Sequence, residues 1–356
     1  MNVLAYIGCY TDEKKTGIHI FDADTESGDF RPVGCVAGIE NAIYLTLNKA
    51  RTRLYAGLGL PALGAPGTNG AVAAYAIQGD TLQPLNHKPI GVTPPCYVAL
   101  DPAERALVFA EYTNAVSGVF ELDADGRLAD TPPVTVTHTG SGPDPKRQEK
   151  AHAHCAEVSP DGRHLCICDL GIDRVKVYDF PARALGLKEI PALAIASAGG
   201  AGPRHLLFHP NRRTAYLLHE LNNTISSFLY TGDAFVHVQT ITMLPPDFTE
   251  YSKASALKLS ADGRRLFGSN RGHDSIAVFR RNPKSGALTW VEVIPTGGKT
   301  PRNFAITPDG AWLIAANQDS DTLTVFAIDQ ASGRLRASGH SLSLPRPVCV
   351  AFVARE

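Results

Sequence analysis

The chain has 356 residues, with 34 Lys and Arg against 35 Asp and Glu, so its formal net charge is −1. No run of like charges is long enough to form a footprint for nucleic acid or for an anionic membrane, which argues against both partners. No stretch approaches the roughly 18 apolar residues of a membrane span, and residues 1–7 lack a basic region and a cleavage site, so we expect a cytoplasmic protein.

A repeated unit of apolar run, tight turn and second apolar run is the main pattern in chain order. The turns lie at residues 101–105, 159–163, 209–213, 260–264 and 307–311, with a weaker copy at 51–55. Each holds Pro, Asp, Asn or Gly in turn positions, or closely related residues. The first apolar residue after each turn, together with the N-terminal run, gives seven anchors: Leu4, Leu54, Leu107, Leu165, Ala215, Leu266 and Leu313.

These anchors are 47 to 58 residues apart. Such a period is typical of four-stranded propeller blades and is too long for most helical solenoids. No segment between the anchors keeps a 3.6-residue apolar period, which also argues against helical repeats. The sequence therefore predicts an all-β fold, a seven-bladed β-propeller of four-stranded antiparallel blades that forms one domain over residues 1–356.

The two ends of the chain predict how the ring closes. The first unit lacks the strand that should precede its turn, because Leu4 lies almost at the N-terminus, and residues 347–352 resemble that missing strand. An open array would expose two sheet edges, whereas pairing the last strand with the first unit removes them. We expect the N- and C-terminal strands to share one blade.

Two longer inserts interrupt the repeat, at residues 57–70 and 139–150. Both are rich in Gly and Pro, and we expect loops on a face of the propeller. Long loops on a rigid ring often border a binding site, although a tolerated surface insertion fits equally well.

The cysteines give little sign of disulfide or metal chemistry. Their count is odd and includes no Cys-x-x-Cys pair, which argues against a disulfide framework and a zinc knuckle. Cys166 and Cys168 are two apart in an apolar run, so we expect small buried side chains on one strand face. The seven are Cys9, Cys35, Cys96, Cys155, Cys166, Cys168 and Cys349.

Polar residues of several units are expected to meet in the central channel, because the first strand of each blade lines it. The first strands begin within 151–157, 202–205, 253–258 and 300–303, and second strands end within 219–222, 269–273 and 316–319. Three arginines, several histidines and Glu220 fall there, which exceeds the charge that a structural channel needs, since buried ions are costly unless paired. A site for a small anion is the simplest interpretation.

Arginine offers a planar donor fork for carboxylate or phosphate oxygens, and the same fork can stabilise the oxyanion formed when water attacks a lactone carbonyl. His154 or Glu220 could take the proton from that water. Structural interpretations stay open beside these: Glu220 could pair with an arginine of the next blade, and Arg302 could be structural. We interpret His205 as a packed strand residue bonded to backbone.

Histidines two apart on one strand, His152 and His154, could also be zinc ligands. No carboxylate or third histidine in matching register accompanies them, so we predict no metal and no cofactor.

Four runs in order resemble the seven-bladed-propeller lactonases, a family that includes propeller-type 6-phosphogluconolactonases and the fungal carboxy-muconate cyclising enzyme. The resemblance extends from the run at 6–11 to the run at 347–350 and rests mainly on residues 202–210, 219–222, 269–276 and 300–304. It implies a metal-independent site in the channel made by His154, Arg204, Glu220 and Arg271. We assign Arg204 and Arg271 to the substrate anion and the oxyanion, and His154 and Glu220 to proton transfer.

Five further residues are expected to bind substrate: His152, Lys258, Asn270, Arg302 and Gln318. The stretch 255–258, Ser-Ala-Leu-Lys, departs from the family, whose members often carry an acidic residue and a histidine there. This departure argues against 6-phosphogluconolactone itself, and the added Lys258 would suit a second carboxylate.

The sequence therefore favours a lactonase acting on a small anionic sugar lactone, the 1,5- or 1,4-lactone of a hexonic or hexaric acid, in carbohydrate catabolism. The alternatives are 6-phosphogluconolactonase proper, a muconate-type cycloisomerase, and a non-catalytic propeller that binds proteins. We expect a monomer or a small homo-oligomer.

Overall fold

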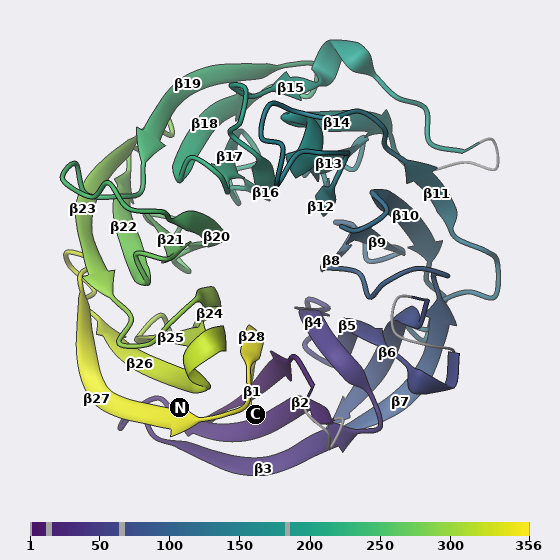
Figure 1. The fold of residues 1–356 in the computed structure, drawn as a ribbon. Coiled ribbons are helices and arrows are strands. Elements are labelled where there is room, and N and C mark those ends of the chain that lie inside the picture. The colour runs from purple at the N-terminus through teal and green to yellow at the C-terminus, as the bar shows by residue number, and fades with distance from the viewer. Residues whose placement is uncertain (1, 12–15, 64–67, 182–185, 356) are drawn as a thin grey trace.

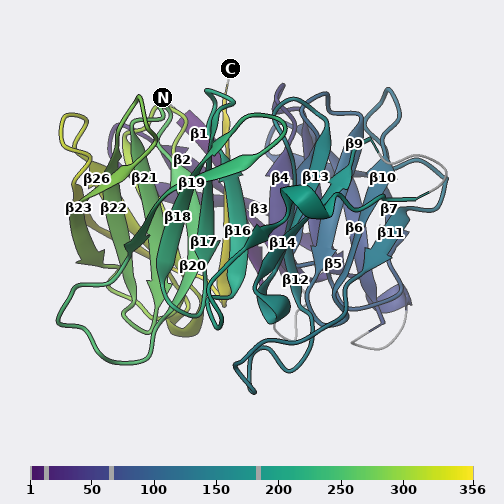
Figure 2. The ribbon, with the colours of Figure 1, turned by 90° about the horizontal axis from the view of Figure 1, so that it is seen from above.

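Seven four-stranded antiparallel sheets surround a central axis in the computed structural model, which describes residues 2–11, 16–63, 68–181 and 186–355. Figure 1 looks down this axis, and Figure 2 shows the ring edge on, with loops projecting from both faces. The all-β, seven-bladed propeller predicted from the repeat is confirmed. No helix of the described ranges is long and apolar enough to cross a membrane.

Four blades come from the ends and the first half of the chain. They comprise β28 (Pro347–Ala354), β1 (Asn2–Cys9), β2 (Thr16–Asp24) and β3 (Phe30–Ala37); β4 (Glu40–Leu47), β5 (Arg53–Gly59), β6 (Gly70–Gln78) and β7 (Thr81–Pro89); β8 (Tyr97–Leu100), β9 (Ala106–Glu111), β10 (Val116–Glu121) and β11 (Val134–Thr137); and β12 (Ala153–Val158), β13 (His164–Asp169), β14 (Arg174–Asp179) and β15 (Ile195–Ala196).

The remaining three blades follow in order, each numbered from the axis outward. They comprise β16 (Pro203–Phe208), β17 (Thr214–His219), β18 (Thr224–Tyr230) and β19 (Phe235–Thr242); β20 (Lys253–Leu259), β21 (Arg265–Arg271), β22 (Ser275–Arg281) and β23 (Leu288–Pro295); and β24 (Pro301–Ile306), β25 (Trp312–Asn317), β26 (Thr322–Ile328) and β27 (Leu335–Ser343). Short 3-10 turns are η1 (Pro61–Leu63), η2 (Leu170–Ile172), η3 (Pro191–Leu193) and η4 (Gln318–Ser320).

The C-terminal strand closes the ring, as expected from the offset between the two chain ends. β28 is the innermost strand of the first blade and pairs antiparallel with β1, from Val3 opposite Ala354 to Gly8 opposite Cys349. Both sheet edges that an open array would leave are thereby paired. The chain ends lie on one face of the ring (Figure 2), opposite the face that Tyr10 reaches after β1.

The core lies between neighbouring blades, because the middle strands bury side chains on both faces. One cluster joins Tyr55 and Val72 of one blade to Phe109 and Phe120 of the next. Burying each of these aromatic side chains contributes about 1.5–3 kcal/mol relative to exposing it. All seven cysteines are free thiols, and Cys166 and Cys168 are fully buried, as their spacing predicts.

The first insert is shorter than its composition suggests. Residues 57–59 belong to β5 and residue 70 opens β6, so only the segment between them connects the strands, and residues 64–67 lie outside the described part. The second insert, 139–150, has no strand and runs between β11 and β12. The loop length predicted from the Gly-rich composition was therefore too long, because small residues also occur in strands where two backbones approach closely.

Gly8 of β1 offers a test of that close packing at the closing blade. A Cβ atom there would lie 2.3 Å from the Ala42 carbonyl oxygen, which is backbone and cannot move away cheaply. We expect Gly8→Ala to lower the free energy of unfolding by about 1–3 kcal/mol, as overpacking does, measured by urea unfolding. Gly199→Ala is the matched control, since its nearest contact would be 3.5 Å from Pro143, and equal stability of the two variants would contradict the packing argument.

Candidate active site

A cavity of about 450 Å³ opens at one end of the channel, a size suited to a small ligand. All seven blades or the loops that lead into them contribute to it. Its lining comprises Tyr10, Asn41, Ile43, Thr93, Pro94, Cys96, Tyr112, Thr113, Arg147, His154, Arg204, Glu220, Lys253, Arg271 and Arg302.

β-bulges in the innermost strands direct side chains into this cavity. The pairing of β12 with β13 skips His154, that of β16 with β17 skips Arg204, and that of β24 with β25 skips Arg302. A bulge places two residues opposite one on the neighbouring strand and re-aims the local side chains. His154, Arg204 and Arg302 therefore occupy equivalent positions on three blades, and all three line the cavity.

The entry to β16 is fixed by a glycine and an aspartate. Gly202 has a φ of 66°, in the left-handed region, and a Cβ atom there would lie 2.7 Å from the Leu221 side chain. Its N–H donates to Oδ1 of Asp173 at 2.8 Å. This turn sets the start of the strand that carries Arg204 two residues later.

Arg204 joins three blades through its guanidinium group. Nε donates to the carbonyl oxygen of Ser255 on β20 at 2.7 Å. Nη1 donates both to Nε2 of His154 on β12 and to Oε2 of Glu220, in close contacts. One nitrogen therefore holds the two residues that the sequence assigned to proton transfer.

Glu220 is fully buried, directly after β17, and both of its oxygens accept hydrogen bonds from arginines. Oε1 lies 2.6 Å from Nη2 of Arg147, and Oε2 lies 2.9 Å from Nη2 of Arg271 and also accepts from Arg204. Burial alone would raise the pKa of this carboxyl group, but the charges of Arg271, Arg204 and Arg147 overcome it and hold the pKa well below its ordinary value. Glu220 is therefore ionised at neutral pH.

His154 is neutral in this arrangement. Burial, followed by the charge of Arg204, holds its pKa well below the ordinary value. Because Nε2 accepts from Arg204, the ring proton is on Nδ1, which lies 3.9 Å from Sγ of Cys96. Burial also raises the pKa of the Cys96 thiol to about 12, so it is a thiol and not a thiolate.

Two further cations line the cavity without a carboxylate partner among the described residues. Arg302 lies over the Tyr10 ring at 5.4 Å, and Nζ of Lys253 lies 5.6 Å from the Tyr251 ring centroid. With Arg147, Arg204 and Arg271, five cationic side chains thus surround the single carboxylate of the lining. The excess of positive charge suits an anionic ligand.

Of the nine predicted site residues, five line the cavity and four do not. His154, Arg204, Glu220, Arg271 and Arg302 are brought together. His152 lies behind the cavity wall, stacked on Tyr112 at 4.2 Å. Gln318 opens η4, where its Nε2 donates to Asp319 at 2.8 Å.

Asn270 and Lys258 are also placed away from the cavity. Nδ2 of Asn270 donates to the Met243 carbonyl oxygen at 3.1 Å, so this amide supports the sheet. Lys258 lies further along β20 with Nζ 5.9 Å from the Tyr44 ring centroid. The cations that the structure adds to the cavity beside the predicted arginines are Lys253 and Arg147, not Lys258.

His205 is packed, as predicted, but through contacts with other rings, and its side chain makes no hydrogen bond to the backbone of any described residue. Its imidazole lies 5.5 Å from the His154 ring and 5.3 Å from the Tyr97 ring. Burial lowers its pKa well below the ordinary value. It is therefore a neutral neighbour of His154 that does not itself line the cavity.

Sequence reasoning missed Arg147, Lys253, Tyr10 and Tyr112 as lining residues. Tyr10 and Tyr112 follow the second strands of their blades, as Glu220 follows β17, so aligning the units at that position would have found them. Lys253 opens β20 and lay within a segment already singled out. No pattern in the sequence marks Arg147, which belongs to the irregular loop 139–150.

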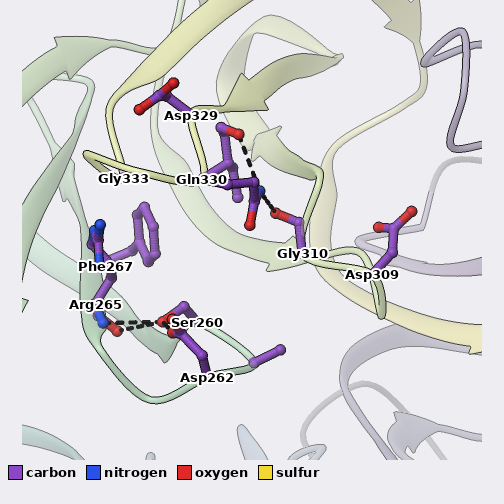
Figure 3. A pocket seen from close by; sticks show the side chains of 11 residues that line it. Ser260, Asp262, Arg265, Phe267, Asp309, Gly310, Asp329, Gln330 and Gly333 are labelled. Carbon is purple, nitrogen blue, oxygen red and sulfur yellow. Dashed lines mark hydrogen bonds between the residues drawn. The ribbon is translucent and has the colours of Figure 1, made fainter.

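A smaller pocket of about 150 Å³ lies between two blades at their turns (Figure 3). There Gln330 donates to the Gly310 carbonyl oxygen at 2.8 Å, and Oγ of Ser260 accepts from the Arg265 N–H at 3.0 Å. The first bond joins two turns of one blade and the second closes a single turn, and the lining residues of this pocket include no histidine or cysteine. Within the described ranges, no group of three or more His, Cys, Asp or Glu side chains could hold a metal ion.

The family described as "Lactonase, 7-bladed beta-propeller" matches residues 4–352. The 6-phosphogluconolactonase of Bacillus subtilis (strain 168) is 37% identical over 354 residues, covering 98% of each chain. The structure of Pseudomonas aeruginosa periplasmic gluconolactonase has a TM-score of 0.92 at 31% identity, covering 99% of each chain, and a putative 6-phosphogluconolactonase from Bacteroides fragilis has 0.89 at 30%, covering 99% of this chain and 98% of that one.

His219 is the last residue of β17, directly before Glu220, and we expect it to make the stability of the fold depend on pH. Nε2 lies 3.0 Å from Oγ of Ser197, and burial lowers the pKa of this histidine to about 4. Below about pH 6.5 the histidine therefore binds a proton in the unfolded chain, whereas in the folded chain it does so only near pH 4. Protonation thus favours the unfolded chain, and stability is lost as the pH falls from about 6.5 to about 4. We expect His219→Gln to lessen this loss by on the order of 2 kcal/mol at pH 4.5.

Urea unfolding of both proteins at several values between pH 7 and pH 4.5 measures the effect. The fall in the free energy of unfolding should be shallower for His219→Gln than for the wild type. If the free energy of unfolding fell in parallel for the two proteins, His219 would not be the cause of the loss of stability at low pH.

Proposed function

The chain belongs to the seven-bladed β-propeller lactonase family, and from that premise we propose that it hydrolyses the lactone of an anionic sugar acid to the open acid. The observation that carries the proposal is a small cavity in which five cations surround one buried carboxylate and one neutral imidazole. Such a site binds an anion, stabilises an oxyanion and keeps a proton acceptor next to both.

The arginines supply the electrostatic part of the reaction. When water attacks the lactone carbonyl carbon, negative charge develops on the carbonyl oxygen. Arg204 and Arg271 are buried donors whose guanidinium groups are oriented by the Ser255 and Ala254 carbonyl oxygens, so both are placed in advance to stabilise that charge. The ring C–O bond then breaks, and the proton taken from water passes to the departing ring oxygen.

The proton acceptors are released by the same event that binds substrate. In the resting site Nη1 of Arg204 donates to both His154 and Glu220. A substrate oxygen that accepts this N–H draws it away from both residues at once. Oε2 of Glu220 and Nε2 of His154 then become available to the attacking water, and the loss of the Arg204 contact makes Glu220 a stronger base.

The unpaired cations favour a substrate that carries a negatively charged group apart from the lactone. Arg302 and Lys253 are separate from the arginines that hold Glu220 and have no carboxylate partner in the described part of the chain. A 6-phosphogluconolactone, the substrate named for the Bacillus subtilis relative, or the lactone of a dicarboxylic sugar acid would fit them. The departure at 255–258 bears little on this choice, because Lys258 does not line the cavity.

The other sequence-based alternatives have less support. A muconate-type cycloisomerase would use the same anion site, but none of the compared relatives described above bears that name. A protein-binding propeller gives no reason for a cluster of buried charges in its channel. The cytoplasmic location stays a prediction, since one similar structure is described as periplasmic.

Replacing Arg204 or Glu220 tests the catalytic assignment. We expect Arg204→Ala to lower kcat by about 10²–10³-fold, the usual loss for one oxyanion donor, and Glu220→Gln to lower it comparably because the base is lost. Release of acid from 6-phosphogluconolactone, gluconolactone and dicarboxylic sugar lactones is followed with a pH indicator, in the presence of chelator. Circular dichroism checks the fold, and unchanged rates in both folded variants would overturn the assignment.

Substitution of Arg302 tests the second anion contact. We expect Arg302→Gln to raise the KM for the phosphorylated or dicarboxylic lactone by about tenfold, as the loss of a charge-assisted hydrogen bond does, while the KM for gluconolactone changes little. Arg336→Gln, an exposed arginine on β27, is the control for a general change of charge. An equal change in KM for charged and uncharged lactones would contradict the proposed contact.

A further inference from the structure

Building on the proposed lactonase function, we propose that Arg147 is a positioning residue for the reaction, which holds Oε1 of Glu220 from the loop 139–150 so that Oε2 faces the attacking water. This loop is the part of the site that the repeat does not supply. The division of the carboxylate between two sets of arginines carries the inference.

The loop is built to hold one conformation. Its backbone closes on itself, with the N–H of Gly142 donating to the Gln148 carbonyl oxygen at 2.9 Å and the N–H of Gln148 donating to the Asp144 carbonyl oxygen at 2.8 Å. The fully buried Gln148 side chain accepts from the Asp144 N–H at 3.1 Å and donates to the Leu170 carbonyl oxygen at 2.8 Å. Arg147 therefore belongs to a turn of fixed conformation and directly precedes the buried Gln148.

Arg147 and the two strand arginines hold different oxygens of Glu220. Nη2 of Arg147 donates to Oε1 at 2.6 Å and to the Tyr112 hydroxyl at 3.3 Å. Arg204 and Arg271 both bind Oε2. The last torsion of a glutamate side chain is soft, so one oxygen must be held if the other is to keep its direction when its donors change.

Exposure separates the three arginines in the same way. The Arg147 side chain is 24% exposed, against 4% for Arg204 and 8% for Arg271. The buried pair is therefore placed to meet substrate, whereas Arg147 lies at the edge and keeps its contact with Oε1. Substrate binding can then release Oε2 without releasing the whole carboxylate.

The positive charge of Arg147 also contributes to the low pKa of Glu220. With the carboxylate pKa held low, the base stays deprotonated to low pH. Removing Arg147 lets this pKa rise, so the acid limb of the rate profile moves to higher pH.

The test compares Arg147→Gln with Arg147→Lys and with Lys146→Gln. Lys146 is the neighbouring residue on the same loop, is exposed, and makes no side-chain hydrogen bond or ion pair with any described residue, so its replacement removes the same charge without the contact. Profiles of kcat and KM against pH are measured on the lactone that the wild type hydrolyses fastest.

We expect Arg147→Gln to lower kcat about tenfold with a smaller change in KM, and to move the acid limb of kcat to higher pH. Arg147→Lys should restore the position of the limb in part, because it keeps the charge, and Lys146→Gln should match the wild type. An acid limb of Arg147→Gln at the wild-type position, or a change confined to KM, would overturn the inference. A wild type without lactone hydrolysis would instead refute the proposed function.

Discussion

The buried carboxylate of Glu220 is the interaction on which the rest of the site depends. Several arginines in one narrow channel would repel each other and lose their hydration, and only a carboxylate placed among them makes that arrangement stable. In turn, Glu220 could not stay ionised at full burial without them. The site is therefore one unit, in which removing Glu220 leaves the buried Arg204 and Arg271 without their carboxylate partner.

The propeller tolerates such a cluster of buried charges because the ring is stabilised by packing outside the channel. Apolar clusters between blades, such as the one around Phe109 and Phe120, stabilise the fold without any contribution from the channel. The innermost strands, whose bulges carry His154, Arg204 and Arg302, can then depart from regular pairing. Rigid blades also fix the distance between side chains on different strands, which a reaction at a lactone carbonyl requires.

The repeat and most of the charged cluster could be predicted from the sequence. The turn signals and the apolar anchors recur in one frame, Arg204 lies at the start of an innermost strand, and Glu220 and Arg271 lie where second strands end. Depth along the axis was harder to predict. Lys258 lies three residues beyond Ser255 on the same strand, about 10 Å at the rise of a β-strand, so it leaves the cavity although it stays near the channel. Arg147 could not be found at all, because the turn around Gln148 depends on contacts that only the folded chain makes.

Both chain ends leave the ring on the face away from the cavity (Figure 2). The strands β1 and β28 run antiparallel through the closing blade, and only their far ends, paired at Cys9 and Pro347, come near the side on which the cavity opens. An affinity tag, a surface linker or a fused partner joined at either end would therefore leave the approach to the cavity open. The molecule can then be immobilised with the opening of the cavity facing the solution.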